Sequence, residues 1–250
     1  YEILSILYIL LQVSFYFFDK FNIMLDMLLL KLKYLLYYYK SKSLKKKCKV
    51  KYSKEKIDFI DKISNKNFSN KWFLNNFEIF NYFLPKNKNE KFNYLEIGCF
   101  EGLSSFYVLS QFKFVNAYFL DIWDEPNKNS KPLTDDFNKV EKLFDENLSK
   151  FNFTKIKDDS VISMRKLLRK NINFDFIYID GSHNGEDILS DAIEAFKILK
   201  KGGLIFFDDF LQYEINRKVQ SYVGIEKFLE LYSNDLQIVF FQNNLAVKKI

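Results

Sequence analysis

The sequence predicts an α/β fold: a doubly wound, mostly parallel seven-stranded sheet with a C-terminal antiparallel hairpin and an N-terminal helical extension. Three observations support this. From residue 92 onward, short β-rich runs alternate with amphipathic segments, the pattern of a parallel sheet with crossover helices. All seven glycines follow residue 97, mostly at predicted strand ends or helix starts. Asn243 and Asn244 separate the last two strands and suit a tight hairpin turn.

The elements are predicted in chain order from this alternation. Strands are expected at residues 93–97, 117–121, 153–157, 174–179, 204–207, 237–242 and 245–249. Helices are expected at residues 54–63, 71–83, 103–112, 135–150, 161–169, 186–200 and 224–232. Pro85 and the following Lys/Asn-rich run mark a boundary. We therefore divide the chain into an extension (1–56), a helical lead-in (57–91) and the sheet domain (92–250).

Composition excludes several classes of protein. An apolar fraction of 48% excludes a disordered chain, and two cysteines exclude a disulfide framework, which favours a reducing, cytoplasmic location. The net charge of +6 is concentrated between residues 40 and 56, where nine Lys stand with one Glu. The other 233 residues carry −2, so the sheet domain lacks the basic footprint of a nucleic-acid-binding protein.

The extension begins with two apolar runs, at residues 3–18 and 21–39. The first is shorter than the roughly 20 residues that span a bilayer, and charges interrupt the second. Apolar and aromatic residues followed by lysines are typical of a membrane-interface anchor, which makes a membrane surface an expected partner of residues 1–56 and predicts a peripheral or anchored protein. The alternative is a pair of helices that pack on the domain or on a second subunit of a homodimer.

A glycine loop follows the first predicted strand of the domain, in the sequence Tyr-Leu-Glu-Ile-Gly-Cys-Phe-Glu-Gly-Leu-Ser-Ser. Gly98 permits a tight turn and close backbone approach, and Gly102 permits close packing of helix and strand. The helix N-terminus, with Ser104, offers donors to an anionic part of a ligand. The G-x-x-x-G spacing differs from the dinucleotide fingerprint and argues against NAD.

Acidic residues close three of the predicted strands. Asp121 ends the second strand, 23 residues after Gly98, where a ribose diol is held in folds of this type. Asp180 ends one buried strand, and Asp208 and Asp209 end the next. If these two strands are neighbours, the three carboxylates converge at the carboxyl edge of the sheet and suit Mg²⁺. The alternative is a set of solvated loop acids and helix caps.

His183 is the chain's single histidine, and it follows Asp180 by three residues in a Gly-Ser loop. An imidazole near its usual pKa of about 6.5 would accept a proton from a substrate hydroxyl. The alternative is a structural or merely exposed histidine.

At these residues the sequence resembles class I S-adenosylmethionine-dependent methyltransferases. The match is to the small-molecule and sugar O-methyltransferase branch, which has I-D-G-x-H, then L-K-x-G-G, then D-D-aromatic on a Rossmann-like sheet. It covers about residues 92–250. The resemblance implies S-adenosylmethionine as cofactor and a hydroxyl of a small molecule or sugar as acceptor. The branch includes Mg²⁺-dependent members and members without metal.

The resemblance also implies roles for individual residues. The methionine part of the cofactor would be held by Glu96, Gly98, Gly102 and Ser104. Asp121 would bind the ribose, Ser160 would touch the adenine, and Asp180 would lie beside the cofactor. Asp180, Asp208 and Asp209 match the acidic positions that carry Mg²⁺. His183 stands where catechol-type enzymes have a catalytic lysine, so the predicted catalytic pair is His183 and Asp180.

Two other functions remain open from the sequence. One is a nucleotide-sugar or NAD-linked oxidoreductase on a similar sheet, against which the glycine spacing argues. The other is a non-catalytic, membrane-tethered binding protein that retains the fold. RNA methylation is disfavoured by the near-neutral domain.

Overall fold

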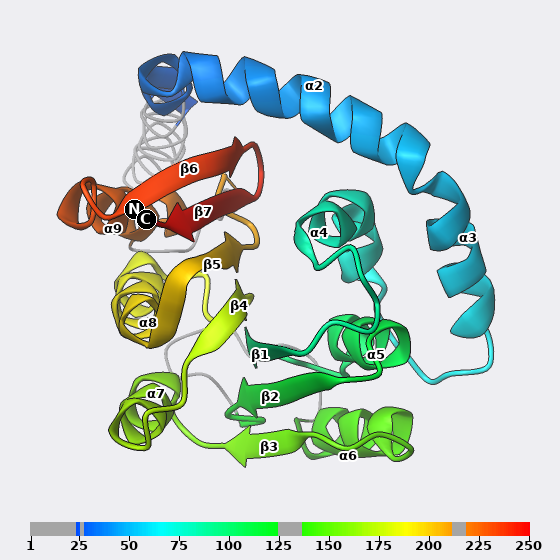
Figure 1. The fold of residues 1–250 in the computed structure, drawn as a ribbon. Helices are drawn as coiled ribbons and strands as arrows, with labels where there is room; N and C mark the ends of the chain where they lie inside the picture. The colour runs from blue at the N-terminus through cyan, green and yellow to red at the C-terminus, as the bar shows by residue number, and fades with distance from the viewer. Residues whose placement is uncertain (1–23, 26–27, 125–136, 212–218) are drawn as a thin grey trace, which may run out of the picture.

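The computed structural model describes residues 24–25, 28–124, 137–211 and 219–250. Seven strands form its central sheet in the order β3-β2-β1-β4-β5-β7-β6 (Figure 1). The neighbouring pairs from β3 to β5 are parallel, and β7 is antiparallel to both β5 and β6. The predicted fold class is confirmed. The strands are β1 Phe92–Ile97, β2 Val115–Asp121, β3 Thr154–Lys157, β4 Phe174–Ile179, β5 Leu199–Phe207, β6 Leu236–Phe241 and β7 Leu245–Lys249.

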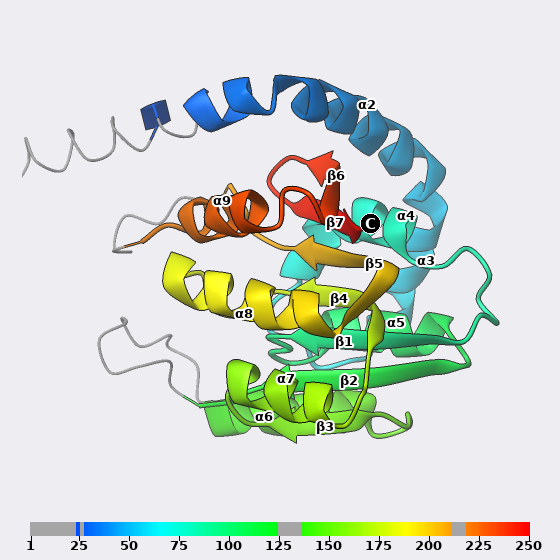
Figure 2. The ribbon, with the colours of Figure 1, turned by 60° about the vertical axis from the view of Figure 1, so that its left-hand side comes forward.

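Helices cover both faces of the sheet (Figures 1 and 2). One face carries α4 (Phe77–Phe83), α5 (Leu103–Gln111) and α6 (Phe137–Leu148). The other carries α7 (Ser160–Arg169), α8 (Gly185–Ile198) and α9 (Ser221–Leu231). Because side chains alternate along a strand, Phe176 and Tyr178 of β4 join the first core, whereas Ile177 and Ile179 join the second. The first core is therefore rich in aromatic side chains and the second in aliphatic ones.

The lead-in is part of the first core. The ring of Phe80 in α4 lies 5.5 Å from Phe176, 5.0 Å from Tyr178 and 5.6 Å from Phe206, between centroids. The single helix predicted at residues 71–83 is wrong, because a short 3₁₀ helix, η1 (Trp72–Asn75), is separated from α4 by Asn76. That break places the Asn76 side chain at the carboxyl edge of the sheet, where it donates to Asp208.

Helix α2 (Leu35–Lys51) runs along the edge strand β6 and continues into α3 (Ser53–Lys62) (Figure 1). The Ser41 hydroxyl accepts the Phe241 N–H at 2.9 Å, and the Tyr38 carbonyl accepts the Gln242 side-chain amide at 2.9 Å. The first bond satisfies a backbone donor of an edge strand that would otherwise be open to another chain, and the second holds the residue that follows this strand. Our prediction had no helix at residues 40–51. The buried positions of α2 include Ser41 and Cys48, which give little apolar periodicity.

The helical path begins before α2, with residues 24–25 and 28–33 also helical. In the ranges that the structure describes, no helix combines the length and apolar character needed to cross a bilayer. The apolar run at residues 3–18 and the predicted start of a helix at residue 135 lie outside the described residues.

Candidate functional site

The loop between β1 and α5 is pressed against the end of β4. Gly98 has φ +82°, and a Cβ there would lie 2.1 Å from the Asp180 carbonyl oxygen. Gly102 has φ +81°, and its Cβ would lie 2.9 Å from the Phe144 ring of α6. Gly98 is therefore needed because the ends of β1 and β4 lie too close together to leave room for a side chain. Gly102 makes room for α6 rather than for a strand, which corrects the packing expected for it.

Glu96 lies on the aromatic face of the sheet and is fully buried. Its carboxylate accepts hydrogen bonds from the Tyr94 hydroxyl at 3.0 Å and from the Ser104 hydroxyl. Burial raises the pKa of Glu96 to about 8, although these hydroxyls oppose the shift. The unfolded chain loses this proton near pH 4.5, so between pH 4.5 and about 8 the folded chain holds a proton that the unfolded chain has lost. Folding stability must therefore fall as pH rises through that window.

Asp121 organises the loops at the end of β2. One carboxylate oxygen accepts the N–H groups of Cys99 at 2.7 Å and Phe100 at 3.0 Å, and the other accepts that of Trp123 at 2.9 Å. Burial raises the pKa of Asp121, and these backbone donors oppose the rise. Phe100 and Trp123 both have positive φ, at 49° and 39°. The carboxylate thus holds two strained loop conformations together at this edge.

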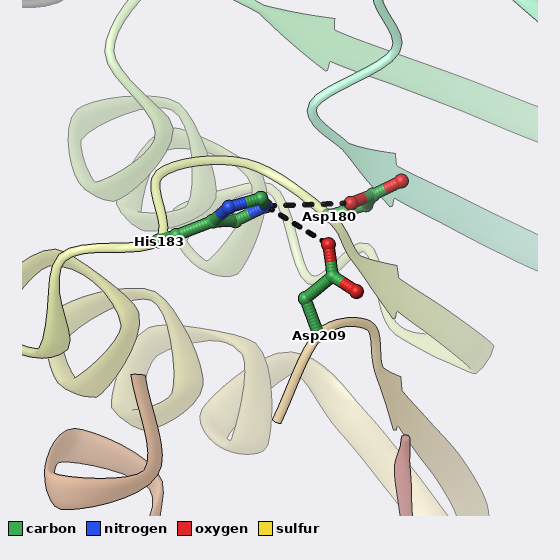
Figure 3. Close-up of side chains that lie close together, drawn as sticks. All are labelled: Asp180, His183 and Asp209. Carbon is green, nitrogen blue, oxygen red and sulfur yellow. Dashed lines mark ion pairs between the residues drawn. The ribbon is translucent and has the colours of Figure 1, made fainter. Parts of the chain in front are cut away.

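Asp180, His183 and Asp209 meet at the carboxyl ends of β4 and β5 (Figure 3). The imidazole Nε2 of His183 lies 3.9 Å from a carboxylate oxygen of Asp180 and 3.6 Å from one of Asp209. All three side chains are partly exposed. Asp209 has φ +48°, a conformation that turns the chain directly after the strand. The structure therefore brings together one histidine and two of the three predicted metal-binding carboxylates.

Asp208 has a different environment from Asp209. One of its carboxylate oxygens accepts hydrogen bonds from Asn76 Nδ2 at 2.7 Å, from Asn244 Nδ2 and from the Asp209 N–H. The other oxygen accepts a hydrogen bond from the Tyr178 hydroxyl at 2.8 Å. The same hydroxyl lies 3.0 Å from Asp180. Burial, with the nearby charges of Asp180 and Asp209, raises the pKa of Asp208 well above its ordinary value. The predicted role of Asp208 as a metal ligand stays a prediction, and here its oxygens are engaged by protein donors.

Ser160 begins α7, and Asp159 caps that helix by accepting the Ile162 N–H at 2.9 Å. The Ser160 hydroxyl donates to Asp191 of α8, whose pKa burial raises to about 7. This bond joins two helices on the aliphatic face, and the adenine contact of Ser160 stays a prediction. The same holds for the cofactor contacts of Glu96, Gly98, Gly102, Ser104, Asp121 and Asp180.

Sequence reasoning missed three residues of this edge: Asn76, Tyr178 and Asn244. Asn76 lies 132 positions from its partner Asp208, and nothing in the local pattern marks it. Asn244 was interpreted only as a turn residue, although its side chain is buried. The alternation of β4 gives a signal for Tyr178, because a buried tyrosine hydroxyl requires a partner and Asp180 follows two positions later on the same face.

Comparison with known proteins indicates which class of enzyme the sheet domain resembles. Residues 95–210 match a family model described as a methyltransferase domain. Together with the order of the strands, this match shows that the chain has the class I S-adenosylmethionine-dependent methyltransferase fold. The matched segment begins in β1 and ends at Phe210, so it contains the loop after β1 and both carboxylates of the histidine cluster. This match favours methyl transfer over the oxidoreductase alternative.

Solved structures share the fold of this methyltransferase domain. MycE, a methyltransferase of the mycinamycin biosynthetic pathway solved with Mg, S-adenosylhomocysteine and mycinamycin VI, is 19% identical with a TM-score of 0.52. The alignment covers 77% of this chain and 53% of MycE. A protein from Clostridium thermocellum described as a putative rRNA methylase is 16% identical with a TM-score of 0.53, over 73% of this chain and 98% of that protein. Identities this low establish the fold alone.

One relative is an uncharacterised protein, R132, of Acanthamoeba polyphaga mimivirus. It is 26% identical over 139 residues, which are 55% of this chain and 60% of the viral protein. The chain thus spans about 60% of the length of this relative and about half of MycE. Residues 95–210 are the part of this chain that matches the family model.

Proposed function

We propose that this methyltransferase domain transfers the methyl group of S-adenosylmethionine to a hydroxyl oxygen of a small molecule or sugar, with a divalent cation at the site. The observation that supports this most is the meeting of Asp180, His183 and Asp209 at the carboxyl edge of the sheet (Figure 3). Open α/β sheets bind their ligands at that edge. An imidazole beside two carboxylates combines a proton acceptor with oxygen ligands for a cation.

The residues around the first loop fit the cofactor. Gly102 is the N-cap of α5, and in the described part of the chain no side chain caps that helix. Its first N–H groups therefore suit the carboxylate of the methionine part. Asp121 lies at the end of β2 with its carboxylate held by loop N–H groups, which fixes an acceptor for ribose hydroxyls.

The donor set also fits a divalent cation. Carboxylate oxygens are the ligands that Mg²⁺ and similar hard cations prefer. Asp180, His183 and Asp209 each offer one possible ligand atom, and these atoms lie within 4.8 Å of one another. Asp180 and Asp209 would hold the ion, and Asp208 is the further carboxylate predicted to do so. A cation bound there supplies Lewis acidity that makes the acceptor hydroxyl more acidic.

The chain's own residues then align the reactants and move one proton. The acceptor oxygen forms a bond to the methyl carbon as the bond from that carbon to sulfur breaks, which leaves S-adenosylhomocysteine. The sulfonium is already activated, so alignment of donor and acceptor is the main contribution of the protein. His183 Nε2 accepts the hydroxyl proton, and the carboxylates of Asp180 and Asp209 stabilise the resulting imidazolium.

One nitrogen cannot both ligate a cation and accept a proton. If Nε2 of His183 binds the ion, His183→Ala will weaken the binding of Mn²⁺, used as a spectroscopic substitute for Mg²⁺. If His183 is the base, the same variant will bind Mn²⁺ normally and lose turnover. Our proposal expects the second result. Asp180→Asn should weaken Mn²⁺ binding, whereas the exposed Asp58→Asn should not.

The first experiment is calorimetry of the folded chain with S-adenosylmethionine. Absence of binding would contradict the proposal at its first step. Release of S-adenosylhomocysteine is then measured across catechols, sugars and hydroxylated glycosides, with and without EDTA. Cofactor binding without turnover on any acceptor would favour the non-catalytic binding protein. Turnover only on RNA would replace the small-molecule acceptor with a nucleic acid.

A further inference from the structure

A row of apolar side chains lies on the outer side of the helical segment that leads into α2. The inner side is buried: Leu30 is 4% exposed, and the Tyr34 ring packs 5.0 Å from Phe241 of β6. The opposite side shows large apolar residues at spacings of three and four, which places them on one helix face. We call this row the apolar face; it consists of Leu28, Leu29, Leu32, Leu36 and Tyr39.

The apolar face is well exposed. Leu36 is 75% exposed, Leu32 is 53% exposed and Tyr39 is 61% exposed. Single exposed leucines are ordinary on a protein surface, but a continuous row of them marks an interaction site. From residue 28 to residue 39 the row extends roughly 16 Å at 1.5 Å per residue. This length is enough for several side chains to enter an apolar phase together.

The helix is held so that this face points outward. The Lys33 ammonium lies 2.6 Å from a carboxylate oxygen of Glu226 and 3.7 Å from one of Glu230, both in α9. With the ring contact of Tyr34, this ion pair fixes the helix to the domain. In both ribbon views α2 forms the outer rim of the molecule (Figures 1 and 2). The apolar face is therefore available to a partner.

A basic surface continues directly from the apolar face. Helix α2 contains seven lysines and no acidic residue. Most of these lysines are exposed, and we call them the lysine row: Lys40, Lys42, Lys46, Lys47, Lys49 and Lys51. Tyr37 and Tyr39 stand where the apolar face meets the lysine row, and tyrosines are enriched at the boundary between lipid and water.

Charge selects between the two occupants that would cover an apolar face. A second copy of the chain would bring two lysine rows together and would be opposed by like-charge repulsion. An anionic lipid surface attracts each lysine and accepts the leucines among its acyl chains. We propose that the apolar face and the lysine row together form a docking surface for an anionic membrane, on which the helix lies without crossing it.

The test uses the full chain and two kinds of vesicle, one of phosphatidylcholine alone and one containing about a third phosphatidylserine. Co-sedimentation should show binding to the anionic vesicles, which weakens as NaCl rises because salt screens the lysines. Lys46→Gln with Lys47→Gln should weaken binding by roughly fivefold per lysine. Leu32→Gln with Leu36→Gln should weaken it at least tenfold, at high salt as well as low.

Matched controls use exposed residues of the same types elsewhere. Leu231→Gln in α9 replaces a leucine that is 62% exposed, and Lys142→Gln in α6 replaces an exposed lysine. Both should leave vesicle binding unchanged, and all variants should melt like the parent because the replaced side chains are exposed. Equal binding by the leucine variants and the parent would overturn the proposal, as would absence of binding at low salt. A dimer in sedimentation equilibrium that the leucine variants dissociate, without vesicle binding, would assign the face to a second copy.

Discussion

Replacement of Gly98 by alanine should separate the ends of β1 and β4. The new Cβ would lie 2.1 Å from the Asp180 carbonyl oxygen and 2.5 Å from the Gly181 Cα, whereas Cβ contacts under 3.0 Å are essentially never observed. These neighbours are backbone atoms, so relief requires one strand end to move by about 1 Å. That movement strains the 2.8 Å hydrogen bond from the Asp180 N–H to the Ile97 carbonyl.

The cost can be divided into three parts. Gly98 has φ +82°, and the left-handed conformation costs alanine roughly 1–2 kcal/mol. Overpacking against backbone adds roughly 1–3 kcal/mol, and the weakened hydrogen bond adds about 1 kcal/mol. The sum is about 3–6 kcal/mol, which corresponds to a fall of roughly 6–24 °C in the melting temperature of a chain of this size.

Gly202 provides the matched control. It has φ +80°, and a Cβ added there would have no neighbouring atom within 4 Å, so Gly202→Ala carries the conformational part alone. Its melting temperature should fall by about 2–8 °C. The two variants are compared by thermal unfolding followed by circular dichroism. Equal losses would refute the claim that Gly98 is required by close approach to Asp180.

Three further predictions concern buried polar contacts, each measured by urea unfolding. In the parent, the raised pKa of Glu96 should make the free energy of unfolding fall between about pH 4.5 and 8, by at most on the order of 5 kcal/mol. Glu96→Gln should abolish this fall. Asn76→Ala should cost about 1–3 kcal/mol, since it takes a donor from partly buried Asp208. Ser41→Ala should cost about 1–2 kcal/mol by leaving the Phe241 N–H unpaired. The matched controls replace exposed residues of the same types, in the same order: Glu90→Gln, Asn75→Ala and Ser43→Ala. A prediction is contradicted if its control changes the stability as much as the variant it matches.

The sheet could be predicted from the sequence because its signals are local. Strands β1, β2, β4 and β5 are short apolar runs that end at, or directly before, a glycine or an acidic residue, and β4 and β7 have the predicted bounds. The strand ends also located Asp180, His183 and Asp209, since parallel neighbours place their carboxyl ends at one edge. Strand β5 begins at Leu199, five residues earlier than predicted, because residues 199–203 resemble the end of the preceding helix in composition.

The environment of Asp208 could not be predicted in the same way. Its amide donors come from the start of α4 and from the turn between β6 and β7, at 132 and 36 positions in sequence. Asparagine is common in turns and at helix starts, so neither residue stands out without the tertiary structure. The sequence predicted three equivalent carboxylates. Only the packing around them distinguishes Asp208, which accepts amide donors, from Asp209, which faces His183.

The same reasoning changes the place of the N-terminal segments in the molecule. Composition separates residues 1–91 from the sheet domain, but α4 packs its aromatic side chains on the sheet and Asn76 reaches Asp208. Ser41 of α2 satisfies the edge strand, while the opposite side of the same helical path carries the apolar face. Because the inward side of this helical path packs on the sheet, its outward side can bind a partner without loss of those contacts. The lysine row lies on α2 and the cluster of Asp180, His183 and Asp209 lies at the ends of β4 and β5, so the two proposals assign them different partners.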